Sequence, residues 1–131
     1  MPEAIVLLKT GISDIDRQHA QLLIYLRDLK EFVGGKYEFA AAFTAVNALL
    51  DYTQQHFAYE EGLLLRYGYP RLEEHIAEHM TLIENVRRQW DKIEHGYSDI
   101  TLEVVETIER WIVEHINLED IEYAKFLNLL C

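Results

Sequence analysis

Apolar residues recur along the chain at the three- and four-residue spacing of one helix face. In the first such segment, SDIDRQHAQLLIYLRDLKEFV, they are Ile15, Leu22, Leu23, Leu26, Leu29 and Val33. This periodicity predicts an amphipathic helix. Ser13, Asp14 and Asp16 are residue types that cap a helix start, and Gly34-Gly35 ends the pattern. We therefore expect a helix over about residues 13–33.

Two further segments have the same helical pattern. The second is expected over about residues 39–65, and its apolar stripe consists of Phe43, Val46, Leu49, Leu50, Phe57 and Leu64. A Tyr-Gly-Tyr-Pro stretch follows and interrupts the pattern. Pro70 suits the start of a third helix, because proline has the φ angle of the first helical turn and needs no hydrogen-bond partner there. This helix is expected to run to about residue 93.

A polar turn at residues 95–99 precedes the last predicted helix, which Ser98 or Asp99 could cap. Short connections between long helices make consecutive helices antiparallel. The sequence therefore predicts an all-α fold, an up-down-up-down antiparallel four-helix bundle. Residues 1–12 would form a short N-terminal arm and residues 13–131 the bundle, together a single domain.

Composition and charge restrict the classes of function. The 131 residues are 50% apolar and 27% charged, which is typical of a globular protein, and the net charge is −11. Nucleic-acid recognition needs a basic surface, so this balance argues against it and against anionic membranes. No apolar run is long enough for a membrane span, and the N-terminus lacks the features of an export signal. The single cysteine, Cys131, fits a reducing cytoplasm.

Histidine and carboxylate residues lie one helical turn apart on both sides of the second break. His56 and Glu60 form one such pair, and His75 and His79 form the other. Residues four apart share a helix face. The two pairs are equally far from Tyr67-Gly68, so antiparallel helices would place them at the same height. Reflection through the first break brings His19 to within one helical turn of this height. Reflection through the third turn does the same for His115 and Asp120.

The complete set predicts a metal site, because burying so many polar groups without a partner would be costly. Five imidazoles and two carboxylates exceed a tetrahedral zinc site, and they contain too much nitrogen for calcium or magnesium. Two octahedral irons bridged by carboxylates would use all seven, and so many neutral nitrogen ligands favour reversible oxygen chemistry. His95 lies in a turn, away from this height. The candidate ligands are His19, His56, Glu60, His75, His79, His115 and Asp120.

Four sequence pieces that carry these ligands resemble the hemerythrin family, in particular the single-domain bacteriohemerythrins. They are GISDIDRQH, HFAYEE, YPRLEEHIAEH and HINLEDIEY, which occur in this order over nearly the whole chain. Any single H-x-x-x-H would be a weak signal, but the combination is specific.

The resemblance implies a di-iron centre with an oxo or hydroxo bridge. One iron would be bound by His75, His79 and His115, and the other, with an open position for dioxygen, by His19 and His56. Glu60 and Asp120 would bridge the two irons. We therefore expect a monomeric oxygen carrier with no catalytic residue, which stores, delivers or buffers dioxygen and supplies an oxygen-consuming enzyme.

Three other functions remain open on the sequence. The chain could be an oxygen or redox sensor acting through a separate partner, or a di-iron enzyme handling peroxide, nitric oxide or iron. It could also be an acidic interaction module without metal, which iron content would distinguish.

Apolar neighbours of the ligands are expected to wall a dry oxygen pocket. The expected walls are Leu22, Leu23, Phe57, Ile83, Trp111, Ile112 and Ile116.

Tyr123, one turn past Asp120, is a candidate for a hydrogen bond to a ligand or for plain packing.

The spacing of the last two ligands does not fit a regular helix. His115 and Asp120 are five residues apart, which separates them by about 140° around an α-helix. We therefore predict a widened turn between them, since π-bulges often mark functional sites.

Overall fold

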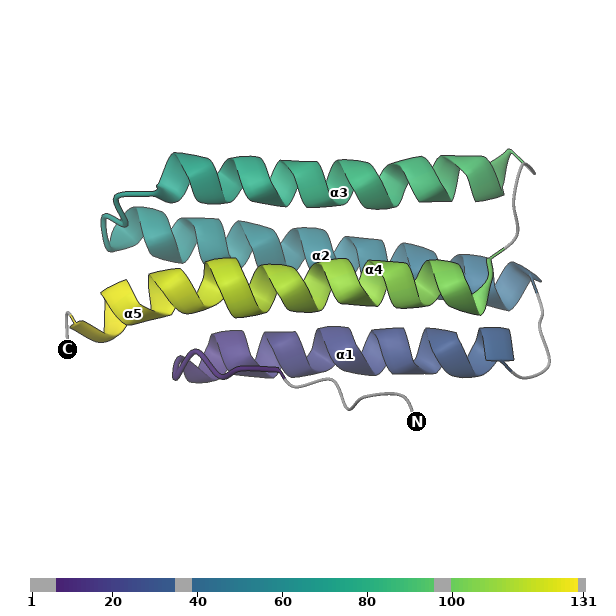
Figure 1. Cartoon of the computed structure of the whole chain (residues 1–131), viewed down its shortest axis with the longest axis horizontal. Coiled ribbons are helices and arrows are strands. Elements are labelled where there is room, and N and C mark those ends of the chain that lie inside the picture. The colour runs from purple at the N-terminus through teal and green to yellow at the C-terminus, as the bar shows by residue number, and fades with distance from the viewer. Residues whose placement is uncertain (1–6, 35–38, 96–99, 130–131) are drawn as a thin grey trace.

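The computed structural model describes residues 7–34, 39–95 and 100–129, which form four long antiparallel helical segments (Figure 1). The first three are α1 (Ser13–Gly34), α2 (Phe39–Arg66) and α3 (Leu72–Glu94). The fourth is continuous through α4 (Leu102–His115), a π-helix η1 (Ile116–Asp120) and α5 (Ile121–Leu129).

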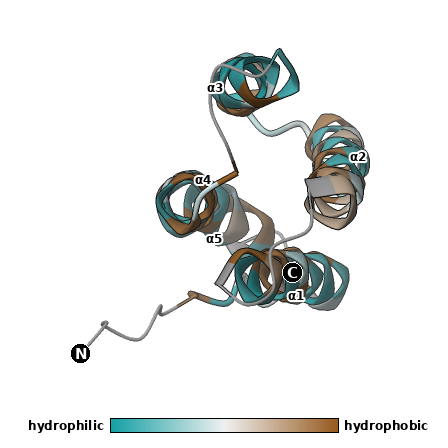
Figure 2. Ribbon diagram, turned by 90° about the vertical axis from the view of Figure 1, so that its right-hand side faces the viewer, coloured by the Kyte–Doolittle hydropathy of each residue, from teal (hydrophilic) through white to brown (hydrophobic). Residues whose placement is uncertain are grey.

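The helices surround a common axis (Figure 2). α1 packs beside α2 and α4, and α3 also packs beside α2 and α4. This arrangement confirms the predicted four-helix bundle. Among the helices that the structure describes, none is both long and apolar enough to cross a membrane.

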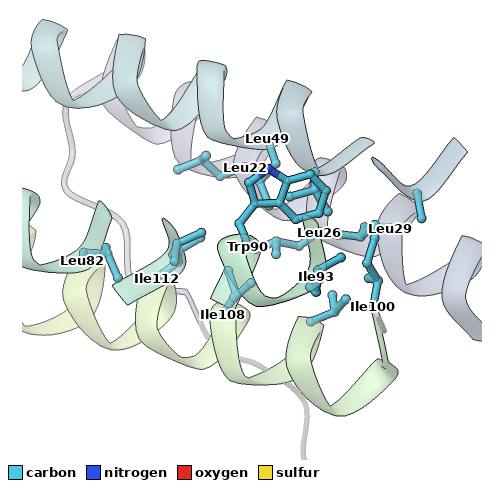
Figure 3. Close-up of a cluster of buried hydrophobic side chains, with 14 of the residues drawn as sticks. Leu22, Leu26, Leu29, Leu49, Leu82, Trp90, Ile93, Ile100, Ile108 and Ile112 are labelled. Atoms are coloured by element: carbon cyan, nitrogen blue, oxygen red, sulfur yellow. The ribbon is translucent and has the colours of Figure 1, made fainter. Parts of the chain in front are cut away.

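The apolar stripes pack into two separate clusters along the bundle. The larger cluster draws on all four helical segments (Figure 3) and includes Leu22, Leu26, Leu29, Leu49, Trp90, Ile93, Ile108 and Ile112. The smaller cluster lies at the end of the bundle that holds the α2–α3 turn and contains Ile15, Leu64, Tyr69, Tyr123, Ala124 and Leu127. On α1 and α3 the candidate ligands fall between the two clusters in the sequence, whereas on α2 and the fourth segment Phe57 and Ile116 of the larger cluster stand between two ligands.

The α2–α3 turn depends on a glycine. Gly68 has a φ of +70°, in the left-handed region that glycine adopts without steric cost. The Tyr69 N–H donates to the Leu64 carbonyl at 3.0 Å and the Gly68 N–H to the Leu65 carbonyl at 3.3 Å. This is the Schellman pattern of helix ends. Pro70 lies in the turn, and α3 begins two residues later than the proline suggested.

The cap of α4 differs from the sequence prediction. Thr101 has extended backbone angles, and its hydroxyl accepts a hydrogen bond from the Val104 N–H at 3.2 Å. Thr101 is therefore the N-cap, a role for which threonine is suited. Ser98 and Asp99, the predicted caps, lie outside the described residues.

The arm is fastened to α1 and to the η1 and α5 parts of the fourth helical segment. Asp16 accepts hydrogen bonds from the Thr10 N–H at 2.8 Å and the Gly11 N–H at 3.1 Å. The Asn128 amide donates to the Thr10 carbonyl at 3.2 Å, and the Leu8 N–H donates to Asn117 Oδ1 at 2.9 Å. Asp16, predicted only as a residue that caps the helix start, thus also fixes the chain segment that precedes α1.

Candidate metal centre

Seven polar side chains meet in the interior between the two apolar clusters. Every one of them is at most 8% exposed, whereas His95 is on the surface. α1 supplies one residue, α2 and α3 supply two each, and the fourth segment supplies the last two. They are His19, His56, Glu60, His75, His79, His115 and Asp120, the complete set singled out from the sequence.

The π-helix brings the last two side chains together. His115 is the last residue of α4, and Asp120 is the last residue of η1. The Ile121 N–H donates to the carbonyl of Ile116, five residues earlier, which is the hydrogen bond of a π-helix. Residues five apart therefore share a face, and His115 Nε2 lies 3.2 Å from Asp120 Oδ1. The predicted widened turn is confirmed.

The two oxygens of Glu60 face two different pairs of histidines. Oε2 lies 3.1 Å from His56 Nε2 and 3.3 Å from His19 Nε2. Oε1 lies 3.1 Å from His79 Nε2 and 3.5 Å from His75 Nε2. One carboxylate thus stands between the histidines of α1 and α2 on one side and those of α3 on the other.

Asp120 is divided in the same way. Its Oδ2 lies 3.0 Å from His19 Nε2, whereas its Oδ1 lies 3.3 Å from His75 Nε2 and 3.2 Å from His115 Nε2. The side chains therefore fall into two groups, each with the geometry to hold a metal ion. Both groups contain Glu60 and Asp120. The histidines of one group are His19 and His56, and those of the other are His75, His79 and His115.

Several of these buried atoms lack hydrogen bonds. Among the described residues, the Nε2 atoms of His56, His79 and His115 and both carboxylate oxygens of Asp120 have no hydrogen-bond partner. They approach other polar atoms closely, but not with the alignment of a hydrogen bond. A buried polar atom left in this way costs about 1–3 kcal/mol. Cations between them would satisfy all five atoms, so the residues fit a pair of metal ions.

Two side chains outside the predicted set orient the histidines. His56 Nδ1 lies 2.6 Å from Gln18 Oε1, and His79 Nδ1 lies 2.8 Å from Glu61 Oε2. Both partner atoms are acceptors, so each Nδ1 carries the proton and each Nε2 presents its lone pair inward. Gln18 and Glu61 were not among the functional residues predicted from the sequence. Their only sequence signal is that each directly adjoins a candidate ligand.

The two buried carboxylates and the neighbouring histidines shift each other's pKa values. Burial alone would lower the pKa of His19, but Asp120 and Glu60 outweigh burial and raise it to about 9. The same balance raises the pKa of His75 to about 9. Burial opposes ionisation of Glu60, yet the facing imidazoles hold the pKa of this carboxyl well below its usual range. Burial and Glu60 likewise oppose ionisation of Asp120, whose pKa the imidazoles still lower. Two carboxylates therefore stay ionised in the interior.

Tyr123 extends the network from α5. Its hydroxyl donates a hydrogen bond to Glu60 Oε2 at 2.8 Å, and the residue is fully buried. Burial and the nearby carboxylates raise the pKa of the phenol, so it remains a donor. Tyr123 therefore makes the hydrogen bond to a candidate ligand that was one of its two predicted roles.

The seven apolar residues expected as pocket walls lie at different depths in the bundle. Leu22, Phe57, Ile112 and Ile116 are buried in the larger apolar cluster, and Leu23, Ile83 and Trp111 are half-buried against it. Phe57 also stacks on the His79 ring, with 3.7 Å between centroids and 4° between planes.

Two openings reach the histidines from outside. Phe57 and Ile83 line a cleft of about 460 Å³ between α2 and α3, which His79 also lines. Trp111 lines a smaller hollow of about 200 Å³ between α3 and α4, which His115 also lines.

Comparison with known proteins agrees with this geometry. The profile described as the hemerythrin HHE cation binding domain matches residues 10–127. A bacteriohemerythrin of Pseudomonas aeruginosa is 34% identical over 117 residues, covering 89% of this chain and 75% of that protein. A bacteriohemerythrin of Clostridium acetobutylicum is 30% identical over 119 residues, covering 86% and 91%. A crystal structure of wild-type hemerythrin superposes with a TM-score of 0.85 at 23% identity and 95% coverage of both chains, which supports the fold. With a family profile over most of its length and relatives of at least 30% identity, this chain belongs to the hemerythrin family.

Proposed function

We propose that this chain binds two iron ions and, through them, binds dioxygen reversibly. The observation that carries the proposal is the division of the seven buried side chains into two metal-capable groups that share Glu60 and Asp120. His75, His79 and His115 would hold one iron, and His19 and His56 the other. The two shared carboxylates would bridge the irons. Membership of the hemerythrin family supports this assignment.

The group with fewer histidines would leave a coordination position open. The two irons would supply the electrons and the binding position that reversible attachment of dioxygen requires. A mainly nitrogen donor set suits this task, because imidazole is a good ligand for iron and adds no negative charge. Five neutral imidazoles and two carboxylates leave the irons with more positive charge than a carboxylate-rich site would.

The chain's own residues would prepare and protect the site. Hydrogen bonds to Gln18 and Glu61 fix the tautomers of His56 and His79, so that their Nε2 atoms are ready to bind metal. Tyr123 holds the Glu60 carboxylate. The apolar clusters before and after the ligands limit the access of water, which would otherwise promote irreversible oxidation of the irons.

The biological role that we propose is storage, delivery or buffering of dioxygen in the cytoplasm by a monomer of a single domain. An oxygen-consuming enzyme would be the recipient. In this role the protein turns over no substrate of its own, and no side chain of the cluster is needed as a general acid or base.

An absorption spectrum with iron quantification tests the proposal. We expect about two irons per chain, and charge-transfer bands that disappear on anaerobic reduction and return as an oxygen adduct over repeated cycles. An adduct that collapses at once to the oxidised state would contradict the carrier function and favour an enzyme or a sensor. Protein without iron after reconstitution would contradict the metal site itself.

A further inference from the structure

The outward nitrogens of His56 and His79 are held by side chains of different charge. The partner of His56 is the neutral amide of Gln18, and the partner of His79 is the carboxylate of Glu61. In the two-iron assignment, His56 and His79 belong to different irons. Each metal group therefore has one identified side-chain partner behind a ligand, and only one of these partners is charged.

We propose that Glu61 is a positioning residue that adds an electronic difference between the two iron positions, beyond their unequal number of histidines. Through His79, its carboxylate stabilises the ferric state of the iron bound by three histidines, while Gln18 gives the other iron no such stabilisation. This inference rests on the proposed di-iron function. It adds a residue that belongs to neither metal-capable group.

The chemistry of the hydrogen bond supports this role. A carboxylate that accepts from Nδ1–H forms a charge-assisted bond, about twice as strong as a neutral one. It also draws positive charge onto the outer side of the ring and makes Nε2 a stronger donor. A stronger donor favours the higher charge of ferric iron over that of ferrous iron. An amide oxygen fixes the same tautomer but adds no net charge.

The packing around His79 makes the effect specific to this ligand. Phe57 stacks on the His79 ring and holds its plane, so the ring cannot turn away from Glu61 without losing this contact. The side chain of Glu61 is 30% exposed where it lines the α2–α3 cleft. The carboxylate is therefore partly open to the cleft, while its Oε2 atom holds His79.

The same cleft provides a matched control. Glu84 on α3 also lines the cleft, so Glu84→Gln removes one negative charge from the lining of the same cleft as Glu61→Gln does. Among the described residues, the only carboxylate hydrogen-bonded to His79 Nδ1 is that of Glu61. If the hydrogen bond carries the effect, the two variants will differ. If only the overall field matters, they will behave alike.

The experiment compares iron-loaded wild type, Glu61→Gln, Glu84→Gln and Gln18→Glu. Circular dichroism confirms folding, iron is quantified, and a spectroelectrochemical titration measures the one-electron reduction of each iron. For Glu61→Gln we expect a higher reduction potential of the iron bound by His79. Its preference for the ferric state should fall about tenfold, which corresponds to about 59 mV. We also expect iron loss to a chelator to reflect a roughly 10–100-fold lower affinity. Gln18→Glu should lower the reduction potential of the iron bound by His56, and Glu84→Gln should have the potentials of the wild type.

The outcomes separate this inference from the proposed function. Two irons in wild type, with equal potentials and iron retention in Glu61→Gln and wild type, would overturn the role of Glu61 and leave the di-iron function standing. Equal shifts in Glu61→Gln and Glu84→Gln would also overturn it. Wild-type protein that binds no iron would overturn both. Mössbauer spectra of the ferric forms should show a change at one of the two iron environments in Glu61→Gln and none in Glu84→Gln, and unchanged spectra in Glu61→Gln would count against the proposal.

Discussion

The hydroxyl of Tyr123 on α5 donates a hydrogen bond to Glu60 on α2. This bond shows how much a single group contributes in a buried polar cluster. Glu60 is fully buried and carries a negative charge, so each donor that it has replaces part of the water lost on folding. Tyr123 is fully buried too, and its ring packs edge-on at 5.3 Å from the ring of His75. The residue thus supports one candidate ligand by a hydrogen bond and another by contact.

Tyr123→Phe should destabilise the iron-free protein by about 1–3 kcal/mol, because it removes one hydrogen-bond donor from a buried charge while keeping the ring. Urea denaturation measures the free energy of unfolding. Tyr59→Phe is the matched control, since Tyr59 also donates to a carboxylate, that of Asp14, but both groups are exposed. Its effect should stay within about 0.5 kcal/mol, and equal losses in the two variants would refute the argument from burial.

His115→Ala should abolish the binding of iron or of dioxygen, because it removes one of the three histidines from the group proposed to hold one iron. His95→Ala removes a histidine from the surface and should affect neither. Iron content and the absorption spectrum after reconstitution distinguish the variants. Full iron and a normal oxygen adduct in His115→Ala would contradict the ligand assignment.

At the scale of elements, two departures from regular helix position the cluster. The Schellman turn at Gly68 reverses the chain so that the histidines of α3 face Glu60 on α2. The π-helix η1 adds one residue to a turn, so that His115 and Asp120 reach the same metal group. Both features are local in the chain, but their effect is to place side chains of different helices within a few ångströms.

Gly68→Ala should destabilise the protein by roughly 1–2 kcal/mol, because a side chain disfavours the left-handed conformation at φ +70°. Nothing lies within 4 Å of the added Cβ, so the cost is that of the backbone alone. Gly62→Ala makes the same exchange inside α2, also with nothing within 4 Å. Alanine is better than glycine in a helix by about 1 kcal/mol, so this variant should be stabilised. Melting temperatures that shift in the same direction in Gly68→Ala and Gly62→Ala would contradict this explanation.

At the scale of the whole molecule, the bundle carries a polar layer between two apolar clusters. The apolar clusters supply the hydrophobic free energy of folding, whereas the polar layer places two ionised carboxylates and five imidazoles in the interior. Hydrogen bonds from imidazole and phenol groups offset part of the desolvation cost, but the atoms without partners leave part of it uncompensated. Folding and metal binding are therefore expected to be coupled.

Removal of iron should lower the melting temperature. A ligand that binds only the folded state at about 1,000 times its dissociation constant adds roughly 4 kcal/mol to stability. Differential scanning calorimetry of iron-loaded protein, chelated protein and chelated protein reloaded with iron measures the change and its reversal. Identical melts of the loaded and chelated forms would show that the cluster is stable without metal.

The sequence by itself determined the four helices, the bundle and the set of seven residues that meet in it. Apolar stripes and pairs such as His56/Glu60 depend on the period of the helix, which is a local property. The spacing of His115 and Asp120 also required a widened turn, because a regular helix separates them. The cap of α4 was placed wrongly, since polar residues stand at several neighbouring positions and only the backbone angles select Thr101.

The tertiary structure alone decided which atoms face one another. The contacts of His56 with Gln18, His79 with Glu61 and Glu60 with Tyr123 join residues 38, 18 and 63 positions apart. The rotation and depth of each packed helix set these distances, and the sequence period does not specify either to within a hydrogen bond. For the same physical reason, the even division of Glu60 and Asp120 between two groups of histidines emerges only when all four helical segments are in place.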